Sequence, residues 1–180
     1  EIGSGLVGSE MCIRDRYSLE TERIIWQYME NEPRIQYIKM EENLGISGNS
    51  NRALQAAKGA YVALLDHDDV LTEDALYWVV DALQRERYDV VYSDEDRMAE
   101  NGSHYLEPRF KPEFDIDLLR AYNYISHLFV ARRELMLADG GFHSQYDGAQ
   151  GYDMILRCCE GNREICHIPR VLYHLSLIHI

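Results

Sequence analysis

Three aspartates lie within four residues of one another, directly after a short apolar run. Asp66, Asp68 and Asp69 follow the run AYVALL, residues 60–65. Carboxylates this close together repel one another unless a divalent cation bridges them, and their oxygens are suitable ligands for such a cation. The spacing therefore predicts a metal site. The alternative is a helix N-cap with ordinary acidic neighbours, because Asp69 also precedes a predicted helix.

A second acidic group follows the next apolar run. Asp94, Glu95 and Asp96 come after YDVVY, residues 88–92. Two predicted strands thus end in acids, and ligands of α/β sheets collect where the strands end. We therefore expect function near residues 66–69. Solvated acids in a turn are the alternative interpretation of the second group.

Both apolar runs are predicted to be strands of one buried, mostly parallel sheet. Continuous apolar runs of this length are typical of strands that are covered on both faces. Helices are predicted on either side of the first strand, at residues 47–58 and 74–85, with Thr72 capping the second helix. The alternation of helix and strand predicts an α/β fold with right-handed crossovers.

The remaining segments are less regular. The predicted elements are a helix at 21–31, a strand at 34–40, a loop at 101–112, an apolar run at 124–130, a helix at 151–160 and a closing extended segment at 165–173. We expect the edge of the sheet to depart from the regular pattern in the later part of the chain.

The composition limits the function classes. A net charge of -13 argues against a nucleic-acid surface. Cys158, Cys159 and Cys166 lack the paired spacing of a zinc site, so reduced cysteines in the core are predicted. No apolar run approaches the roughly 20 residues of a membrane-spanning helix, which leaves peripheral membrane association open.

Several segments match one known family in the same order along the chain. The longest is NLGISGNSNRALQAAKGAYVALLDHDDVLTEDAL, residues 43–76. The others are YSDED at 92–96, the stretch from EPRF to RREL at 107–135, GGF at 140–142, DGAQGYDMILR at 147–157 and IPRVLYH at 168–174. Together they resemble the inverting glycosyltransferases of family 2, most closely the bacterial members that build cell-surface polysaccharides. The resemblance implies the GT-A fold, a Rossmann-like and mostly parallel sheet flanked by helices.

The resemblance also implies a metal. In that family the aspartates of a D-x-D motif hold Mn²⁺ or Mg²⁺ against the diphosphate of a sugar nucleotide, where the cation stabilises the leaving group. Asp66, Asp68 and Asp69 match this motif, and Asp68 is the first choice for a direct ligand. His174 matches a family histidine that can supply a further metal contact, and a structural histidine is the alternative.

Residues that bind the donor are implied in the same way. They are Asn43, Gly45, Asn49 and Asn51 beside the nucleotide base, Asp66 at the ribose or sugar, and Asp94 and Glu95 near the donor sugar and acceptor groove. Helix capping is the alternative for the first segment. Arg109 and Lys111 could meet phosphate or sugar, or could be solvated in a loop.

The catalytic base is the point at which this chain departs from the family pattern. Inversion at the anomeric carbon requires a base that takes the proton of the acceptor hydroxyl. Many members carry an acid where this chain has Gly151. Asp153 is then the predicted base and Asp147 the alternative, and either acid could instead cap a helix. The departure leaves weakened activity open.

The implied function is metal-dependent transfer of a sugar, with inversion, from a uridine or thymidine diphosphate sugar to a glycan or lipid-linked acceptor. One alternative is a sugar-nucleotide-binding domain without catalysis, for which Gly151 is the hint. Another is a nucleotidylyltransferase of similar architecture, which would need a glycine-rich and basic phosphate loop after its first strand. Cytosolic donors and reduced cysteines predict a cytoplasmic location, with attachment to the inner face of the membrane left open.

Both ends of the chain read as a translated sequencing adapter. EMCIRDR, residues 10–16, can be encoded by GAGATGTGTATAAGAGACAG, and the reverse complement of this word translates to LSLIHI, residues 175–180. This interpretation divides the chain into a tail at 1–16, a partial GT-A domain at 17–174 and a tail at 175–180. The first two strands of the family, with their P-x-Y-N and D-D-x-S motifs, would then be missing. Their loss predicts poor stability and no activity for the fragment as written, and the implied function then belongs to the parent protein.

Overall fold

The computed structural model describes residues 19–40, 42–99, 102–138 and 140–176. Its strands are β1 (Tyr61–Leu64), β2 (Val70–Leu71), β3 (Val90–Met98), β4 (Tyr105–Arg109), β5 (Phe129–Arg132) and β6 (Ile165–Ser176). Its helices are α1 (Leu19–Asn31), α2 (Gly45–Ala56), α3 (Ala75–Arg85), α4 (Ile116–Ala121), α5 (Arg133–Ala138) and α6 (Gln150–Cys159), with one 3₁₀ turn, η1 (Ser144–Tyr146). The predicted helices at 21–31, 47–58, 74–85 and 151–160 correspond to α1, α2, α3 and α6.

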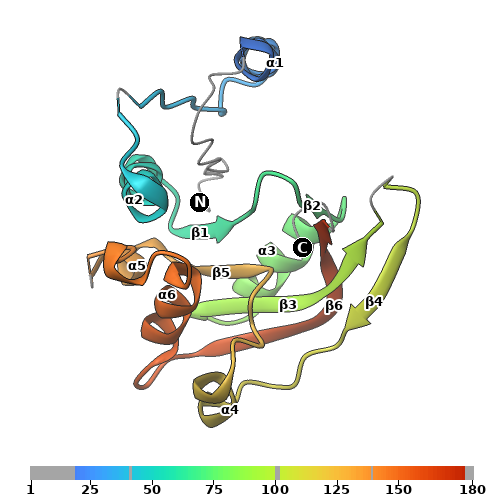
Figure 1. The fold of residues 1–180 in the computed structure, drawn as a ribbon. Coiled ribbons are helices and arrows are strands. Elements are labelled where there is room, and N and C mark those ends of the chain that lie inside the picture. Colours follow the sequence, from blue (N-terminus) through green and yellow to red (C-terminus); the bar gives the residue numbers. More distant parts are fainter. Residues whose placement is uncertain (1–18, 41, 100–101, 139, 177–180) are drawn as a thin grey trace.

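The strands form one mixed sheet in the order β1-β5-β3-β6-β2, with β4 paired to β3 (Figure 1). β3 and β6 run parallel, whereas β5 lies antiparallel between β1 and β3. β1, β3 and β6 therefore point in the same direction. The expected α/β class is confirmed, and the sheet is mixed because β5, β4 and β2 each pair antiparallel with their neighbours.

A hydrophobic cluster covers each face of the sheet. Val90 and Tyr92 of β3 belong to one cluster and Val91 belongs to the other, as the side-chain period of two in a strand requires. Apolar residues of α2, α4, α5 and α6 complete the first cluster, and α3 covers the second. Burial on both faces is the reason that the residues at 60–65 and at 90–92 are continuously apolar.

The second acidic group lies inside a strand, so the prediction that it follows a strand end is wrong. β3 continues to Met98 because β6 pairs along it and β4 joins it at Glu95. The charged side chains hid this extension, since they break the apolar pattern. β4 itself lies within the predicted loop at 101–112.

The segment before α2 differs from the prediction. Residues 34–40 form no strand, because no strand in the described part of the chain pairs with them, although their alternation has a strand period. Trp26 of α1 contacts Tyr37 edge-on, with ring centroids 6.2 Å apart. None of the helices that the structure describes is both long and apolar enough to cross a bilayer.

The predicted tails fall mostly outside the described residues. Residues 1–16 and 177–180 lie there entirely. Leu175 and Ser176, the first two residues of the predicted C-terminal tail, continue β6. The division into a native domain and two tails stays a prediction.

Candidate functional site

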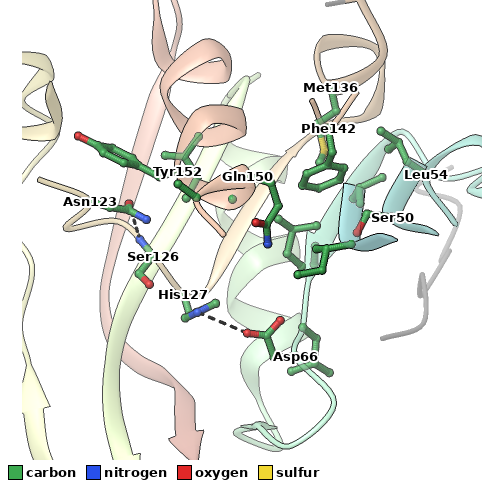
Figure 2. A pocket seen from close by; sticks show the side chains of 18 of the residues that line it. Ser50, Leu54, Asp66, Asn123, Ser126, His127, Met136, Phe142, Gln150 and Tyr152 are labelled. Carbon is green, nitrogen blue, oxygen red and sulfur yellow. Dashed lines mark hydrogen bonds and ion pairs between the residues drawn. The ribbon is translucent and has the colours of Figure 1, made fainter. Parts of the chain in front are cut away.

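A cavity of about 360 Å³ opens where β1 ends. Its walls come from α2, from β1 with Asp66, from the segment 123–127 and from the start of α6. Figure 2 shows Asp66 and His127 at one end of the cavity and the apolar side chains of Phe142 and Met136 at the other. The cavity therefore has a charged end, at the exit of a strand, and an apolar end.

Asp66, Asp69 and His127 form a cluster at the charged end, referred to below as the acid–imidazole cluster. One potential ligand atom from each lies within 4.8 Å of the others. His127 Nε2 is 3.8 Å from Asp66 Oδ2, and His127 Nδ1 is buried without a hydrogen-bond partner. Two carboxylates and an imidazole at this spacing fit a divalent transition-metal ion.

Asp69 is the more enclosed carboxylate of the cluster. The Tyr173 hydroxyl donates to Asp69 Oδ2 at 2.5 Å, and the backbone N–H of Ser176 donates to Oδ1 at 2.7 Å. Burial raises the pKa of Asp69, and these two hydrogen bonds oppose the shift. A nearby cation would favour the charged form that burial disfavours. Asp66 is more open, with 63% of its side chain exposed.

Asp68 and His174 are not members of the acid–imidazole cluster. Asp68 Oδ1 lies 3.7 Å from His67 Nδ1. His174 Nδ1 lies 2.5 Å from Asp96 Oδ1, and the ring of Tyr105 stacks on His174 at 3.7 Å. His174 thus has the buried hydrogen bond and ring contact expected of a structural histidine. Both residues stay predictions as metal ligands.

Asp94 and Glu95 are buried, so the alternative of solvated turn acids is wrong. Their exposed fractions are 2% and 3%. Asp94 Oδ1 accepts the backbone N–H of Lys111 at 2.9 Å and lies 2.8 Å from His167 Nε2. Neither acid lines the cavity. Both acids lie outside the cavity lining, and their contact with the donor stays a prediction.

Lys111 is the buried cation of this group. Its ammonium donates to Glu95 Oε2 at 3.1 Å, to the carbonyl of Ile125 at 2.6 Å and to the carbonyl of His127. Burial lowers the pKa of Lys111, and Glu95 opposes the shift. Arg109 Nη1 lies 3.5 Å from Glu95 Oε1. The alternative of a solvated loop lysine is therefore wrong for Lys111.

The start of α2 is held by local side-chain hydrogen bonds. Asn43 Oδ1 accepts the N–H of Gly45 at 2.9 Å, and Asn49 Oδ1 accepts the N–H of Leu44 at 3.3 Å. Gly45 has a φ of +76°, a conformation that favours glycine. These bonds support the capping alternative. Ile46 and Ser50 are the residues of this first part of α2 that line the cavity.

Asn51 joins α2 to the segment before η1. Its amide donates to the carbonyl of Phe142 at 2.8 Å and accepts the N–H of Phe142 at 2.7 Å. Gly141 permits this approach, because a Cβ there would lie 2.1 Å from Asn51 Oδ1. The Asn51 side chain thus joins α2 to Phe142, which lines the cavity. The predicted contacts of Asn43, Gly45, Asn49 and Asn51 with a nucleotide are untested.

The two candidate bases have different surroundings. Asp153 Oδ2 accepts from Arg157 Nε at 3.0 Å and from Arg157 Nη2 at 2.8 Å. Asp147 Oδ1 accepts from the Ser47 hydroxyl at 2.5 Å. Neither carboxylate lines the cavity, whereas Gly151 does, and a Cβ at Gly151 would meet nothing within 4 Å.

His127 and Tyr173 are the site residues that sequence reasoning missed. His127 lies in the apolar run at 124–130, and a polar residue that interrupts such a run was the available signal. Nothing in the sequence indicated Tyr173, because a tyrosine in a largely apolar strand is expected to be an ordinary core residue. Their contacts with residues 66–69 depend on pairings between distant parts of the chain.

The fold is an α/β domain, and its candidate site lies where the strand β1 ends, the usual place for ligands in such sheets. The model of the family Glycosyl transferase family 2 matches residues 9–138. The chain belongs to this family, as its motifs predicted.

Relatives extend the comparison. The chain is 42% identical over 169 residues to protein y4gI of Sinorhizobium fredii. The match covers 91% of this chain and 18% of that protein. It is 36% identical over 153 residues to the O-antigen biosynthesis protein RfbC of Myxococcus xanthus, covering 84% of this chain and 12% of that protein. The chain therefore spans less than a fifth of either relative.

A solved structure shares the fold. The crystal structure of S. aureus TarS 1-349 in complex with UDP-GlcNAc has a TM-score of 0.69 and 20% sequence identity, and the match covers 92% of this chain and 47% of that chain. This likeness shows a common α/β architecture.

Proposed function

We propose that this protein transfers a sugar from a uridine diphosphate sugar to a glycan acceptor with the help of a divalent cation. The observation that carries the proposal is the acid–imidazole cluster at the charged end of the cavity. A cavity of about 360 Å³ lies within the range of small-molecule sites. Family membership, the UDP-GlcNAc complex of TarS and the name of RfbC support the donor and acceptor classes.

The donor atoms of the cluster favour Mn²⁺ over Mg²⁺. Carboxylates suit both ions, whereas the imidazole of His127 suits a transition metal better than Mg²⁺. Asp66, Asp69 and His127 would hold the ion. When bound, the cation supplies Lewis-acid stabilisation of the leaving diphosphate.

The polar side chains of the cavity would orient the sugar nucleotide. Ser50, Asn123, Ser126 and Gln150 line the cavity and offer hydroxyl and amide groups that can bond sugar or base. Leu54, Phe142 and other apolar residues at the far end would exclude water from bound ligand.

For the catalytic base we place Asp147 ahead of Asp153. The guanidinium of Arg157 makes two hydrogen bonds to Asp153 Oδ2, so this oxygen is already occupied and is not free to approach an acceptor hydroxyl. Asp147 has the neutral Ser47 hydroxyl as partner and directly precedes Gly148, which lines the cavity. Proton transfer to Asp147 would accompany a single displacement with inversion.

Donors of this class are cytosolic, so we place the reaction in the cytoplasm. A lipid-linked acceptor would bring the protein to the inner face of the membrane. The second candidate function is sugar-nucleotide binding without catalysis, favoured by the absence of a carboxylate at Gly151.

Release of UDP from a panel of UDP-sugars by the parent protein tests the proposal, with a glycan acceptor mixture and either Mn²⁺ or EDTA. We expect UDP release with Mn²⁺ only. Asp66→Asn should lower the rate by about 100-fold or more, because it removes charge that acts on the leaving group through the metal.

Asp68→Asn is the matched control for this measurement. Asp68 lies in the same loop but outside the acid–imidazole cluster, so its substitution should have a smaller effect. UDP binding without turnover in wild-type protein would favour the non-catalytic candidate. An Asp68→Asn variant that loses more activity than Asp66→Asn would contradict the proposed ligand set.

A further inference from the structure

Tyr173 contacts every member of the acid–imidazole cluster. Its hydroxyl donates to Asp69 Oδ2 at 2.5 Å and accepts the backbone N–H of Asp66 at 3.2 Å. Its ring stacks on the imidazole of His127, with centroids 4.7 Å apart and planes 14° from parallel. One side chain of β6 therefore fixes two residues of the β1 exit loop and one residue of the segment before β5.

The Tyr173 side chain is itself rigidly held. Its exposed fraction is 0%, and it packs in the hydrophobic cluster beneath α3 with Leu172 and Leu128. The hydroxyl uses its donor for Asp69 and accepts from the Asp66 backbone, so hydrogen bonds hold the polar end of the side chain while the cluster holds its ring. The remaining hydrogen bond to Asp69 comes from the backbone of Ser176, three residues further along β6.

We propose that Tyr173 is a positioning residue that pre-organises the acid–imidazole cluster for its metal ion, an inference that rests on the metal role proposed above. It orients the Asp69 carboxylate, fixes the peptide that begins the Asp66 loop and sets the plane of the His127 ring. Tyr173 supplies no ligand atom to the cluster.

The positioning role predicts a specific loss when only the hydroxyl is removed. In Tyr173→Phe the ring still stacks on His127, whereas Asp69 loses one of its two donors and the Asp66 N–H loses its acceptor. Groups that orient metal ligands change metal affinity by about 10- to 100-fold when they are lost. We expect Tyr173→Phe to weaken Mn²⁺ binding by this factor.

Tyr92→Phe is the matched control. Tyr92 is also fully buried, its hydroxyl donates to the carbonyl of Pro112 at 2.6 Å, and its ring stacks on His167 at 4.9 Å. It resembles Tyr173 in burial, hydrogen bonding and stacking on a histidine, but it touches no member of the cluster. Its loss should affect the stability of the fold without changing Mn²⁺ affinity.

The experiment measures Mn²⁺ affinity of the 180-residue chain and both variants through the electron paramagnetic resonance signal of free Mn²⁺. Thermal unfolding of the metal-free proteins, followed by circular dichroism, is measured alongside. The expected result is a 10- to 100-fold weaker affinity for Tyr173→Phe and an unchanged affinity for Tyr92→Phe, with similar melting temperatures for the two variants.

Two results would overturn the inference. Wild-type affinity in Tyr173→Phe would show that the cluster does not need the hydroxyl, and equal losses in both variants would indicate general loosening of the fold. A wild-type chain that is folded by circular dichroism but binds no Mn²⁺ would remove the metal role in the proposed function, and this inference with it. The behaviour of the wild-type chain thus separates the two failures.

Discussion

At the scale of single residues, the candidate catalytic base is the point at which this chain departs from the family pattern. Asp147 and Asp153 flank residues 148–152, which line the cavity. Of these two acids, Asp153 is the one that accepts hydrogen bonds from Arg157. We expect Asp147→Asn to lower kcat by about 10²- to 10⁴-fold, the range for loss of a general base. Asp153→Asn is the control and should lower kcat much less. Steady-state UDP release measures both, and the reverse ranking would make Asp153 the base.

Gly151 offers a second test of the same chemistry. A side chain at this position meets nothing within 4 Å and would project from a residue that lines the cavity. Gly151→Asp, added to Asp147→Asn, should restore part of the lost turnover because it returns a carboxylate to the cavity. Gly148→Asp is the control, since its φ of +97° strains any residue with a Cβ. Rescue by neither variant would argue against a missing carboxylate as the cause of the loss.

At the scale of elements, the buried pair of Lys111 and Glu95 joins β3 to the segment before β5. Glu95 Oε2 accepts the N–H of His127 at 3.2 Å, and Lys111 donates to the carbonyl of the same residue. The pair therefore holds both polar groups of the His127 backbone. These two hydrogen bonds fix the His127 backbone, which carries the imidazole beside Asp66.

Removing one partner of the pair should be costly. Among the described residues, Lys111→Met leaves the buried Glu95 with only the partly exposed Arg109 guanidinium, at 3.5 Å, as a cationic partner, and we expect a loss of about 3 kcal/mol in the free energy of unfolding. The double variant Lys111→Met, Glu95→Gln should lose less, because no net charge stays buried. Urea unfolding measures both. A double variant at least as unstable as the single one would show that the pair matters for its hydrogen bonds rather than for its charge balance.

The elements also show how far the sequence could predict this structure. The apolar run at 60–65 and the acids after it identified β1 and the loop that carries Asp66 and Asp69. The extension of β3 to Met98 was hidden, because its acids are buried by contacts with β6 and with the chain near Lys111. Burial of those charges depends on tertiary contacts that no local pattern encodes.

The candidate site was predictable to a similar extent. Two of the three members of the acid–imidazole cluster lie in one short motif, and the third comes from a segment about sixty residues away. The insertion of β5 between β1 and β3 brings His127 to Asp66. Periodicity predicts a strand but not the strand that pairs with it. For the same reason the strand predicted at 34–40 was wrong, since no described strand pairs with these residues.

At the scale of the whole molecule, the pairing through β5 and along β3 points β1, β3 and β6 in one direction, and a hydrophobic cluster covers each face of the sheet. The cavity at the end of β1 combines walls from α2, α6 and the segment at 123–127. No single element of the fold contains the site. The site proposed for a sugar nucleotide therefore depends on contacts among several elements.

The central claim is that a metal ion at the acid–imidazole cluster holds the diphosphate of the donor. A crystal structure of the protein with Mn²⁺ and UDP, using anomalous scattering at the manganese edge, tests it most directly. We predict an anomalous peak bonded to Asp66, Asp69 and His127, with the UDP diphosphate on its open side. Bound UDP with no peak there, or a peak beside Asp96 and His174 instead, would contradict the account.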